Sequence, residues 1–436
     1  MTATRPARSY LPIAALALLA IALTAAYAAA LGPDPEPRRD DQVQYLALAR
    51  GLIERGEFTR AGAGEPFVPE PLRFPGYPLL LAAVCRTVGC ERIVAVQAVL
   101  LALAVVLTVR FGAPALGGRR ALVAGALVAA YPTFAYFAAL TLSEITATVL
   151  LAGACVAFVA MAERPSAPRA LVAGALLGAL ALTRPFFLPL PLLLAALALG
   201  PRRRSVRSLA PALLLAIAAF GAVLAPQVAY SLTSFGRPLV GSLGTQLWLG
   251  YFQGLAPADL DDFQRAEADA GRAAIARLEN AADRRTQAYA FVALDDELRA
   301  RALVLMAHDP LGYLARGAVR SVVLWAGEVP ARDAGATLPD AVRSAWLALE
   351  LSFLGVGLVG SVRLARRGDL RALVPLALVL FVWALSFPLW AEGRFSLPAK
   401  PLLAIGVVAA LSAPRPGGPS EARPGGRAAR GGASRP

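Results

Sequence analysis

Ten apolar runs dominate the sequence, and most are long enough to cross a lipid bilayer as a helix. A span needs about 20 apolar residues to cross the bilayer as a helix. The sequence therefore predicts an all-α, polytopic membrane protein with about ten transmembrane helices. The predicted spans are 10–31, 92–112, 121–139, 142–162, 168–184, 185–200, 208–230, 342–362, 371–390 and 395–413.

The composition agrees with this class and argues against an ordinary soluble enzyme. Apolar residues make up 57% of the chain and charged residues only 17%, against about 25% in soluble domains. The net charge is +14, and every basic residue except Lys400 is arginine. Because the chain is rich in Ala, Arg, Gly and Pro throughout, a coding bias explains the arginines, and we expect no nucleic-acid partner.

The placement of arginines predicts the orientation of the spans, because short cytoplasmic loops carry an excess of positive charge. With the N-terminus inside, three short inner loops are basic, and a fourth carries Arg363, Arg366, Arg367 and Arg371. If the apolar segment 313–325 also crossed the membrane, this fourth loop would lie outside. We therefore predict that 313–325 is an interfacial or re-entrant helix. We expect an integral protein of a bacterial-type inner or plasma membrane, with both termini cytoplasmic.

Two long segments, 32–91 and 231–341, fall on the outer side and are expected to carry interfacial helices. Within the second, residues 259–306 read as helical, and His308 is predicted to end that helix. Asp309 would then cap the next one, which begins at Pro310. We predict a membrane domain over 1–413 and a disordered basic cytoplasmic tail over 414–436. The first run resembles a signal peptide but is longer than a signal core, so it is predicted to remain as the first helix.

Ionisable residues gather where the predicted spans meet the outer side. Such residues are costly at membrane depth and are often functional. Transfer of a sugar from a lipid-linked phosphate needs a carboxylate to accept the acceptor's proton and cations to hold the departing phosphate. Arginine presents a planar donor fork that matches phosphate oxygens. The candidate residues are Asp40, Asp41, Arg73, Glu144, Arg184, Glu392, Arg394 and Lys400.

Each of these residues also has a structural interpretation that leaves the function open. Asp41 and Gln44 fit a capping box for a helix over 42–55, and Glu144 can cap the fourth span. Arg73 can extend to the membrane interface, and Arg184 can anchor a span boundary. Glu392 and Arg394 can form a mutual surface pair. Asp40 can be merely solvated, and Lys400 can be a chance use of lysine.

Cysteine and histidine are too few to build a metal site of the zinc or haem type. The chain has three cysteines and one histidine, without ligand spacing. Cys85 and Cys90 can form a disulfide if they face an oxidising compartment. Cys155 lies in an apolar run and is predicted to be a buried core thiol. No cofactor is predicted, and a divalent cation held jointly by carboxylates and substrate is left open.

Five stretches of the sequence resemble a known family of membrane glycosyltransferases. They look like motifs of the dolichyl-phosphate-mannose protein mannosyltransferase-like and aminoarabinose transferase-like enzymes, which share the GT-C fold. The resemblance covers nearly the whole chain to about residue 413. The stretches are 40–58 with DDQVQYLALARGL and GEF, 73–82 with RFPGYPLLLA, 142–144 with LSE, 182–185 with LTRP, and 392–401 with EGRFSLPAKP.

The resemblance implies an inverting transferase with an extracytoplasmic active site. Its expected partners are a polyprenyl-phosphate sugar donor, a lipid or cell-envelope glycan acceptor, and membrane lipids. It implies that Asp41, four residues before Tyr45, is the base or acceptor-orienting carboxylate, although Asp40 is also a candidate. Arg394, with Arg184 and Arg73, is implied to bind the donor phosphate. Glu144, Glu392, Lys400 and Tyr45 are supporting candidates.

Two other functions remain open on the sequence. A transporter or flippase for a lipid-linked sugar is the main alternative, but it would place charges or helix breaks in the middle of spans and would show repeated halves. A noncatalytic membrane scaffold would leave the outer acidic and basic residues dispensable. The clustering of charges at one side favours the enzyme.

Overall fold

The computed structural model describes residues 10–32, 40–200, 206–280, 283–326, 329–330 and 339–412. The predicted tail over 414–436 and the side chain of Asp40 lie outside the described part. Throughout the described ranges the regular elements are helices, as predicted.

Six helices are long and apolar enough to cross a membrane when the short 3-10 turns before two of them are included. They are α1 (Leu11–Leu31), α4 (Ile93–Leu116) with η1 (Cys90–Arg92), α7 (Glu144–Glu163), α10 (Val206–Phe235), α15 (Asp340–Ala365) and α17 (Lys400–Leu411) with η4 (Gly393–Phe395) and η5 (Leu397–Ala399). A seventh candidate is the pair α5 (Gly118–Ala129) and α6 (Pro132–Ala138), which is bent by 55°.

Three shorter apolar helices account for the remaining predicted runs. They are α8 (Ala167–Thr183), α9 (Leu190–Ala198) preceded by η2 (Pro185–Phe187), and α16 (Leu370–Ser386). The predicted spans 168–184 and 185–200 are separated at Arg184, where α8 ends and Pro185 prevents its continuation. Each predicted run therefore corresponds to a helix or to the bent pair, and the chain is an integral membrane protein.

The two long outer segments carry their own helices. The first contains α2 (Asp40–Glu54) and α3 (Gly76–Thr87). The second contains α11 (Leu243–Phe252), η3 (Pro257–Asp259), α12 (Asp262–Glu279), α13 (Arg284–His308) and α14 (Pro310–Ala326). The single helical stretch predicted over 259–306 is wrong, because the chain forms two helices there. Asp283 caps the second of them by accepting a hydrogen bond from the Thr286 backbone N–H at 2.9 Å.

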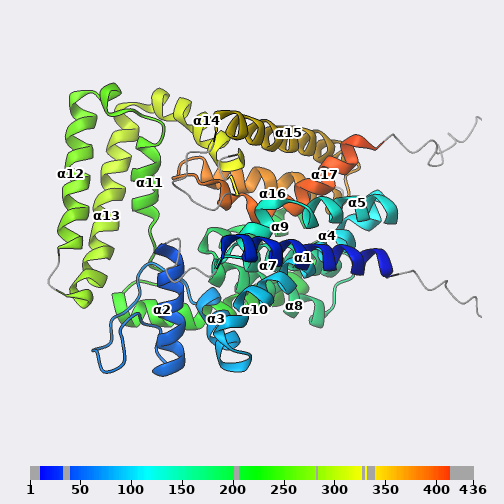
Figure 1. The fold of residues 1–436 in the computed structure, drawn as a ribbon, viewed down its shortest axis with the longest axis horizontal. Coiled ribbons are helices and arrows are strands. Elements are labelled where there is room, and N and C mark those ends of the chain that lie inside the picture. The colour runs from blue at the N-terminus through cyan, green and yellow to red at the C-terminus, as the bar shows by residue number, and fades with distance from the viewer. Residues whose placement is uncertain are drawn as a thin grey trace, which may run out of the picture.

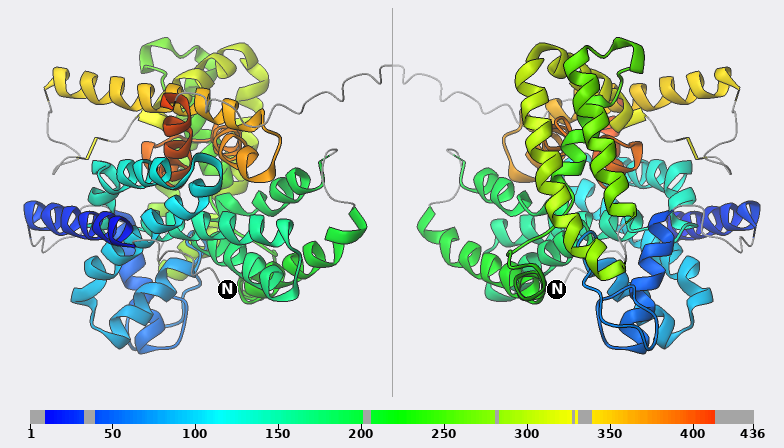
Figure 2. Two further views of the ribbon diagram at one scale, coloured as in Figure 1. Left: turned by 90° about the vertical axis from the view of Figure 1, so that its right-hand side faces the viewer. Right: turned by 90° about the vertical axis from the view of Figure 1, so that its left-hand side faces the viewer.

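Both outer segments lie at the same end of the molecule. In Figure 1 the spans of the bundle run roughly horizontally, while α2 and the helices α11–α13 stand upright at the left. The right-hand view of Figure 2 looks onto this end and shows both groups facing the viewer. The beginning of α1 and the end of α17 lie at the opposite end of the bundle (Figure 1). This arrangement is the one expected if the two outer segments share one side of the membrane.

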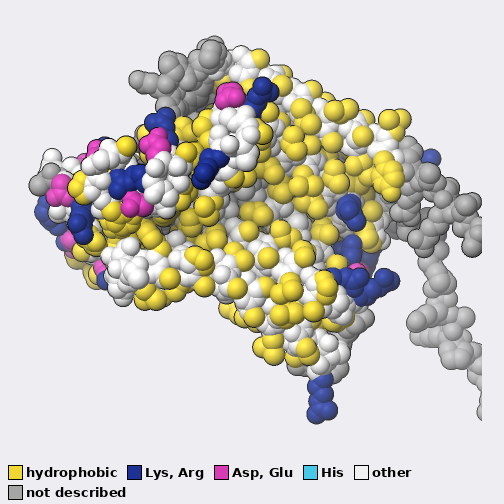
Figure 3. All heavy atoms as spheres, turned by 90° about the horizontal axis from the view of Figure 1, so that it is seen from below, with side chains coloured by type: hydrophobic (Ala, Val, Ile, Leu, Met, Phe, Trp, Pro, Cys, Tyr) yellow, Lys and Arg dark blue, Asp and Glu magenta, His cyan; other side chains and the backbone are white. Residues whose placement is uncertain are grey.

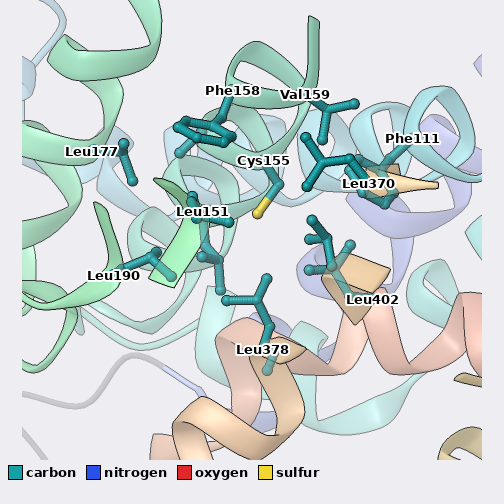
Figure 4. Close-up of a cluster of buried hydrophobic side chains, with 14 of the residues drawn as sticks. Phe111, Leu151, Cys155, Phe158, Val159, Leu177, Leu190, Leu370, Leu378 and Leu402 are labelled. Atoms are coloured by element: carbon teal, nitrogen blue, oxygen red, sulfur yellow. The ribbon is translucent and has the colours of Figure 1, made fainter. Parts of the chain in front are cut away.

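The bundle is held together by a large apolar core and presents apolar side chains outward. Cys155 of α7 is fully buried among Phe158, Leu378 and Leu402 from three helices (Figure 4), as predicted for a core thiol. On the face shown in Figure 3, a broad area of the molecule is covered by apolar side chains, while charged ones gather mainly at the left end, along the upper edge and at the right. A lipid bilayer would cover such a surface without exposing apolar groups to water.

A disulfide joins Cys85 near the end of α3 to Cys90 at the start of η1, as the sequence allowed. Their Cα atoms are 4.1 Å apart. The bond ties the first outer segment to the beginning of α4.

Candidate functional site: carboxylates and arginines at one end of the bundle

The Asp41 carboxylate lies between two arginines that come from distant parts of the chain. Its Oδ1 is paired with the Arg73 guanidinium, and its Oδ2 accepts a hydrogen bond from Arg394 Nη1 at 2.8 Å. Arg73 precedes α3, whereas Arg394 lies in η4, 353 residues after Asp41. The Asp41 side chain is 20% exposed, so these partners replace much of its contact with water.

The two arginines set the ionisation of this carboxylate. Burial acts to raise the pKa of Asp41, but the charges of Arg73 and Arg394 and their hydrogen bonds outweigh it and lower the pKa below its usual value. Asp41 is therefore ionised at neutral pH in this arrangement.

Glu144 is a second carboxylate of the same cluster. It lies in the first turn of α7 and is almost completely buried, with its side chain 1% exposed. Its Oε1 is 2.5 Å from Arg184 Nη2 and 3.6 Å from Arg394 Nη1. Glu392 adds a third carboxylate, whose Oε2 is 2.5 Å from Arg394 Nε. Arg394 thus contacts three acidic side chains.

The backbone around the cluster is built so that these side chains can meet. A Cβ on Gly76 would lie 2.6 Å from the Leu182 carbonyl carbon, so only glycine lets the start of α3 approach the end of α8 so closely. This contact brings Arg73 and Arg184 to the same region. The Ser143 hydroxyl, directly before α7, is 3.3 Å from Arg184 Nε and 3.5 Å from the Tyr45 hydroxyl.

Tyr45 packs against the cluster through Arg73. The Arg73 guanidinium carbon lies 5.2 Å from the centre of the Tyr45 ring, within the range of a cation–π contact. Tyr45 also packs edge-on against the fully buried Tyr77, with ring centres 4.9 Å apart. The Tyr77 hydroxyl in turn is 3.0 Å from Gln97 Oε1.

The predicted capping box at the start of α2 is not formed. Helix α2 begins at Asp40, which places Asp41 inside its first turn rather than at the cap position. The Asp41 oxygens are taken by arginines, and Gln44 Oε1 accepts a hydrogen bond from Arg73 Nε at 2.9 Å. Both polar groups of the expected box therefore hold arginines. Glu144 makes no cap hydrogen bond either, because Ser143 occupies the cap position of α7.

Lys400 belongs to a different cluster from the one predicted. Its Nζ is 2.8 Å from Glu350 Oε2 in α15 and 3.3 Å from the Tyr131 hydroxyl at the bend between α5 and α6. Lys400 and Glu350 are 4% and 2% exposed. Glu350 is absent from the predicted site. The sequence did carry a signal for it, because Glu350 is the single acidic residue in the apolar run 342–362.

His308 is a helix-end residue, as predicted. It is the last residue of α13, and its Nε2 is 2.9 Å from Asp261 Oδ2 at the start of α12. Asp309 caps α14 as predicted, since its Oδ1 accepts a hydrogen bond from the Gly312 backbone N–H at 2.9 Å. Across the residues that the structure describes, no three His, Cys, Asp or Glu side chains are grouped so that they could hold a metal ion.

Comparison with known proteins relates the chain to membrane glycosyltransferases. Residues 75–230, about a third of the chain, match the family model described as dolichyl-phosphate-mannose-protein mannosyltransferase. The apo crystal structure of the Archaeoglobus fulgidus oligosaccharyltransferase aligns with a TM-score of 0.53 and 11% identity, covering 92% of this chain and 50% of that chain. No curated protein sequence gives a significant match.

Two further solved structures align with the chain. The Archaeoglobus fulgidus oligosaccharyltransferase AglB, in complex with an inhibitory peptide and a dolichol-phosphate, has a TM-score of 0.52 and 13% identity, covering 91% of this chain and 50% of that chain. ArnT from Cupriavidus metallidurans bound to undecaprenyl phosphate has a TM-score of 0.41 and 14% identity, covering 91% of this chain and 77% of that chain. The chain spans about half the length of the oligosaccharyltransferase structures, and at these identities they show a shared fold.

Proposed function

We propose that this chain, which has the GT-C fold and carries a segment matching the mannosyltransferase family model, is an inverting membrane glycosyltransferase. Its donor is a polyprenyl-phosphate-linked sugar and its acceptor a lipid or cell-envelope glycan at the extracytoplasmic face. The observation that carries the proposal is the Asp41 carboxylate held between Arg73 and Arg394, with Arg184 nearby on Glu144. One carboxylate and three guanidinium groups are the elements that this reaction requires.

The arginines suit the donor phosphate. As the sugar leaves, the bridging oxygen of the donor becomes part of a phosphate with one more negative charge, and nearby cations stabilise that charge. In the structure, each of these arginines donates to a carboxylate: Arg73 and Arg394 to Asp41, and Arg184 to Glu144. A phosphate is a stronger and similarly shaped partner, so it can replace part of these contacts without movement of the backbone.

The same exchange gives Asp41 its catalytic role. While it is paired with both Arg73 and Arg394, the Asp41 carboxylate has a lowered pKa and is a poor proton acceptor. When the donor phosphate takes over Arg73 and Arg394, the carboxylate loses its two positive partners and its basicity rises. It then accepts the proton of the acceptor hydroxyl, whose oxygen forms the new bond to the sugar. The bond from the sugar carbon to the phosphate oxygen breaks, and the polyprenyl phosphate leaves with the electron pair.

The solved AglB complex contains a dolichol-phosphate, which supports a lipid phosphate as the donor group here. The transporter alternative gains no support from the cluster, because its charges lie at one end of the spans. We infer that the second outer segment faces the acceptor, since its helices α11–α13 stand at the same end of the molecule as α2, the helix that carries Asp41 (Figure 1).

The test compares variants of the cluster with variants of an exposed pair of the same residue types. Asp41→Asn and Arg394→Ala are assayed for transfer of labelled sugar from polyprenyl-phosphate donors in membranes, beside Asp269→Asn and Arg272→Ala. Asp269 and Arg272 form an exposed pair on α12 with 2.5 Å between Oδ1 and Nη2. We expect both cluster variants to lose about 100-fold or more in activity, and the control variants to stay within about twofold.

Asp40→Asn separates the two candidate carboxylates. Full activity in Asp40→Asn with loss in Asp41→Asn assigns the role to Asp41. Full activity in both variants would remove the carboxylate mechanism. Transport of a lipid-linked sugar across vesicles by the wild type, without transfer, would favour the flippase.

A further inference from the structure

The segment Phe387–Ala391, which leads from α16 into Glu392 and Arg394, is held through its backbone by the second outer segment. We call it the lead-in segment. Two side chains of α14, the side chain of Gln253 directly after α11, and one backbone carbonyl of α11 form hydrogen bonds with its backbone. The hydrogen bonds are Arg320 Nε to Phe387 O at 2.9 Å, Tyr313 hydroxyl to Pro388 O at 3.0 Å, Trp390 N to Gln246 O at 2.9 Å, Gln253 Nε2 to Ala391 O at 2.8 Å, and Ala391 N to Gln253 Oε1 at 2.8 Å.

Gln253 makes the bonds closest to the candidate site. Its amide pairs reciprocally with Ala391, accepting from the backbone N–H and donating to the carbonyl oxygen. Ala391 is 1% exposed, so water cannot replace these bonds easily. Ala391 directly precedes Glu392, and Arg394 is the third residue after Ala391. A shift of the Ala391 backbone would therefore move the arginine that contacts Asp41.

The contact between α11 and the lead-in segment is also tight. A Cβ on Gly250 would lie 2.6 Å from the carbonyl carbon of Leu389, so the helix backbone packs directly on the segment. Arg320 is fully buried beside them, and its Nη1 donates to the Gly250 carbonyl at 2.7 Å. One guanidinium thereby joins α11, α14 and the end of α16.

The second outer segment can act on the lead-in segment as a rigid unit. Helices α11 to α14 share an apolar core of their own, formed around Trp248, Tyr251, Leu298 and Leu305. Asp295 of α13 is also fixed to the start of α11, with its Oδ2 2.9 Å from the Gly244 backbone nitrogen. A displacement of this unit would therefore be passed to Ala391 rather than absorbed within it.

We propose that Gln253 is a positioning residue, through which the second outer segment sets the place of the Arg394 guanidinium relative to Asp41. The proposal rests on the transferase function proposed above. Gln253 is too far along the chain from the motifs around Asp41 and Arg394 for the sequence to link it to them. Only its amide pair with Ala391 makes the connection. In this role Gln253 contributes no group to the reaction and acts only through Arg394.

The test uses a matched pair of glutamines on and beside α11. Gln253→Ala removes the amide pair with Ala391, whereas Gln246→Ala leaves the Gln246 carbonyl that Trp390 uses. In the purified full-length protein with a polyprenyl-phosphate sugar donor, we expect Gln253→Ala to lower kcat at least about tenfold, as small misplacements of catalytic groups do. We expect the acceptor KM to be unchanged and Gln246→Ala to stay within about twofold of the wild type.

A double-variant cycle separates positioning from a general structural role. If Gln253 acts through Arg394, Gln253→Ala costs little further activity in an Arg394→Lys background, in which the planar fork is already lost. An equal loss in both backgrounds, or wild-type activity in Gln253→Ala, would overturn the proposal. If Gln253→Ala does not yield monodisperse protein, Gln253→Glu takes its place. It keeps the size of the side chain and removes the donor to Ala391 O, and the same outcomes apply.

The result also distinguishes this proposal from the transferase function itself. Full transfer in Arg394→Ala would remove the phosphate site on which both depend. Loss of transfer in Arg394→Ala, together with equal activity in Gln253→Ala and Gln246→Ala, would remove only the positioning role.

Discussion

Removing one partner of the buried pair between Lys400 and Glu350 should strongly destabilise the protein. The two charged groups are 2.8 Å apart, and both side chains are less than 5% exposed. Lys400→Met would leave the Glu350 carboxylate among apolar helices without its cation. Breaking a buried ion pair in this way costs about 3–5 kcal/mol, whereas replacing both partners by apolar residues is often near neutral. We therefore expect about 3–5 kcal/mol of destabilisation in Lys400→Met and Glu350→Leu, and a much smaller effect in the double variant.

The measurement is denaturant-induced unfolding in detergent micelles, followed by tryptophan fluorescence, for the wild type, both single variants and the double variant. The coupling free energy is the difference between the effect of the double change and the sum of the single effects. It should be several kcal/mol, and the double variant should retain most of its transfer activity.

Three outcomes would refute this reasoning. Single variants within about 1 kcal/mol of the wild type would show that the pair is not desolvated as the structure places it. A stable double variant without transfer activity would show that Lys400 supports the reaction, as the sequence analysis proposed. Strictly additive losses would show that the two side chains do not act as a pair.

Two further predictions concern the surroundings of Asp41. Glu70 Oε1 accepts hydrogen bonds from the Leu72 and Arg73 backbone N–H groups at 2.8 and 3.0 Å, so Glu70→Ala should lower the free energy of unfolding by about 1–3 kcal/mol and reduce transfer. The Glu65 carboxylate in the same loop accepts from the Gly62 backbone N–H and pairs with Arg284 but is more than half exposed, so Glu65→Ala should destabilise the protein less and leave transfer unchanged. Equal melting temperatures and activities for these two variants would contradict this expectation. Because the pKa of Asp41 is lowered, its stabilising contribution is complete above the usual aspartate value of about 4 and is lost as pH falls through the lowered pKa. Melting scans between about pH 7 and pH 3 should therefore show a steeper acid loss in the wild type than in Asp41→Asn, and parallel curves would count against it.

The class of fold could be predicted from the sequence because the apolar runs leave few alternatives. A continuous run of about 20 apolar residues satisfies its backbone within a bilayer only as a helix. The break at Arg184 and the cap at Asp309 also follow from local chemistry, since proline and a capping aspartate act on adjacent residues. The long helix predicted over 259–306 failed, because its Ala-rich, charged composition favours helix on both sides of the turn and does not reveal the reversal of direction.

The candidate site could be predicted in its members and only partly in its contacts. Charged residues near the ends of apolar runs pointed to Asp41, Arg73, Glu144, Arg184 and Arg394, and the structure brings all five together. The same rule also named Lys400, whose ion pair in the structure is with Glu350.

Lys400 went to another partner because of how the helices pack. Its partner Glu350 lies on α15, and the faces of α15 and α17 that meet are set by packing over their whole length. A Cβ on Gly360 would lie 1.7 Å from the Gly406 carbonyl oxygen, so the two helices approach too closely for larger residues there. That approach brings Glu350 to Lys400, and no local pattern in the sequence encodes it.

The sequence by itself determined that this protein is a helical membrane protein and which residue types stand at the ends of its spans. Those properties depend on residues within one turn or one span of each other, where hydrophobicity and backbone hydrogen bonding act directly. The tertiary structure decided which carboxylate pairs with which arginine, that Gln44 holds Arg73 instead of capping α2, and that Gln253 reaches Ala391. Those contacts join segments up to 353 residues apart, and only the packing of many helices brings such segments within hydrogen-bonding distance.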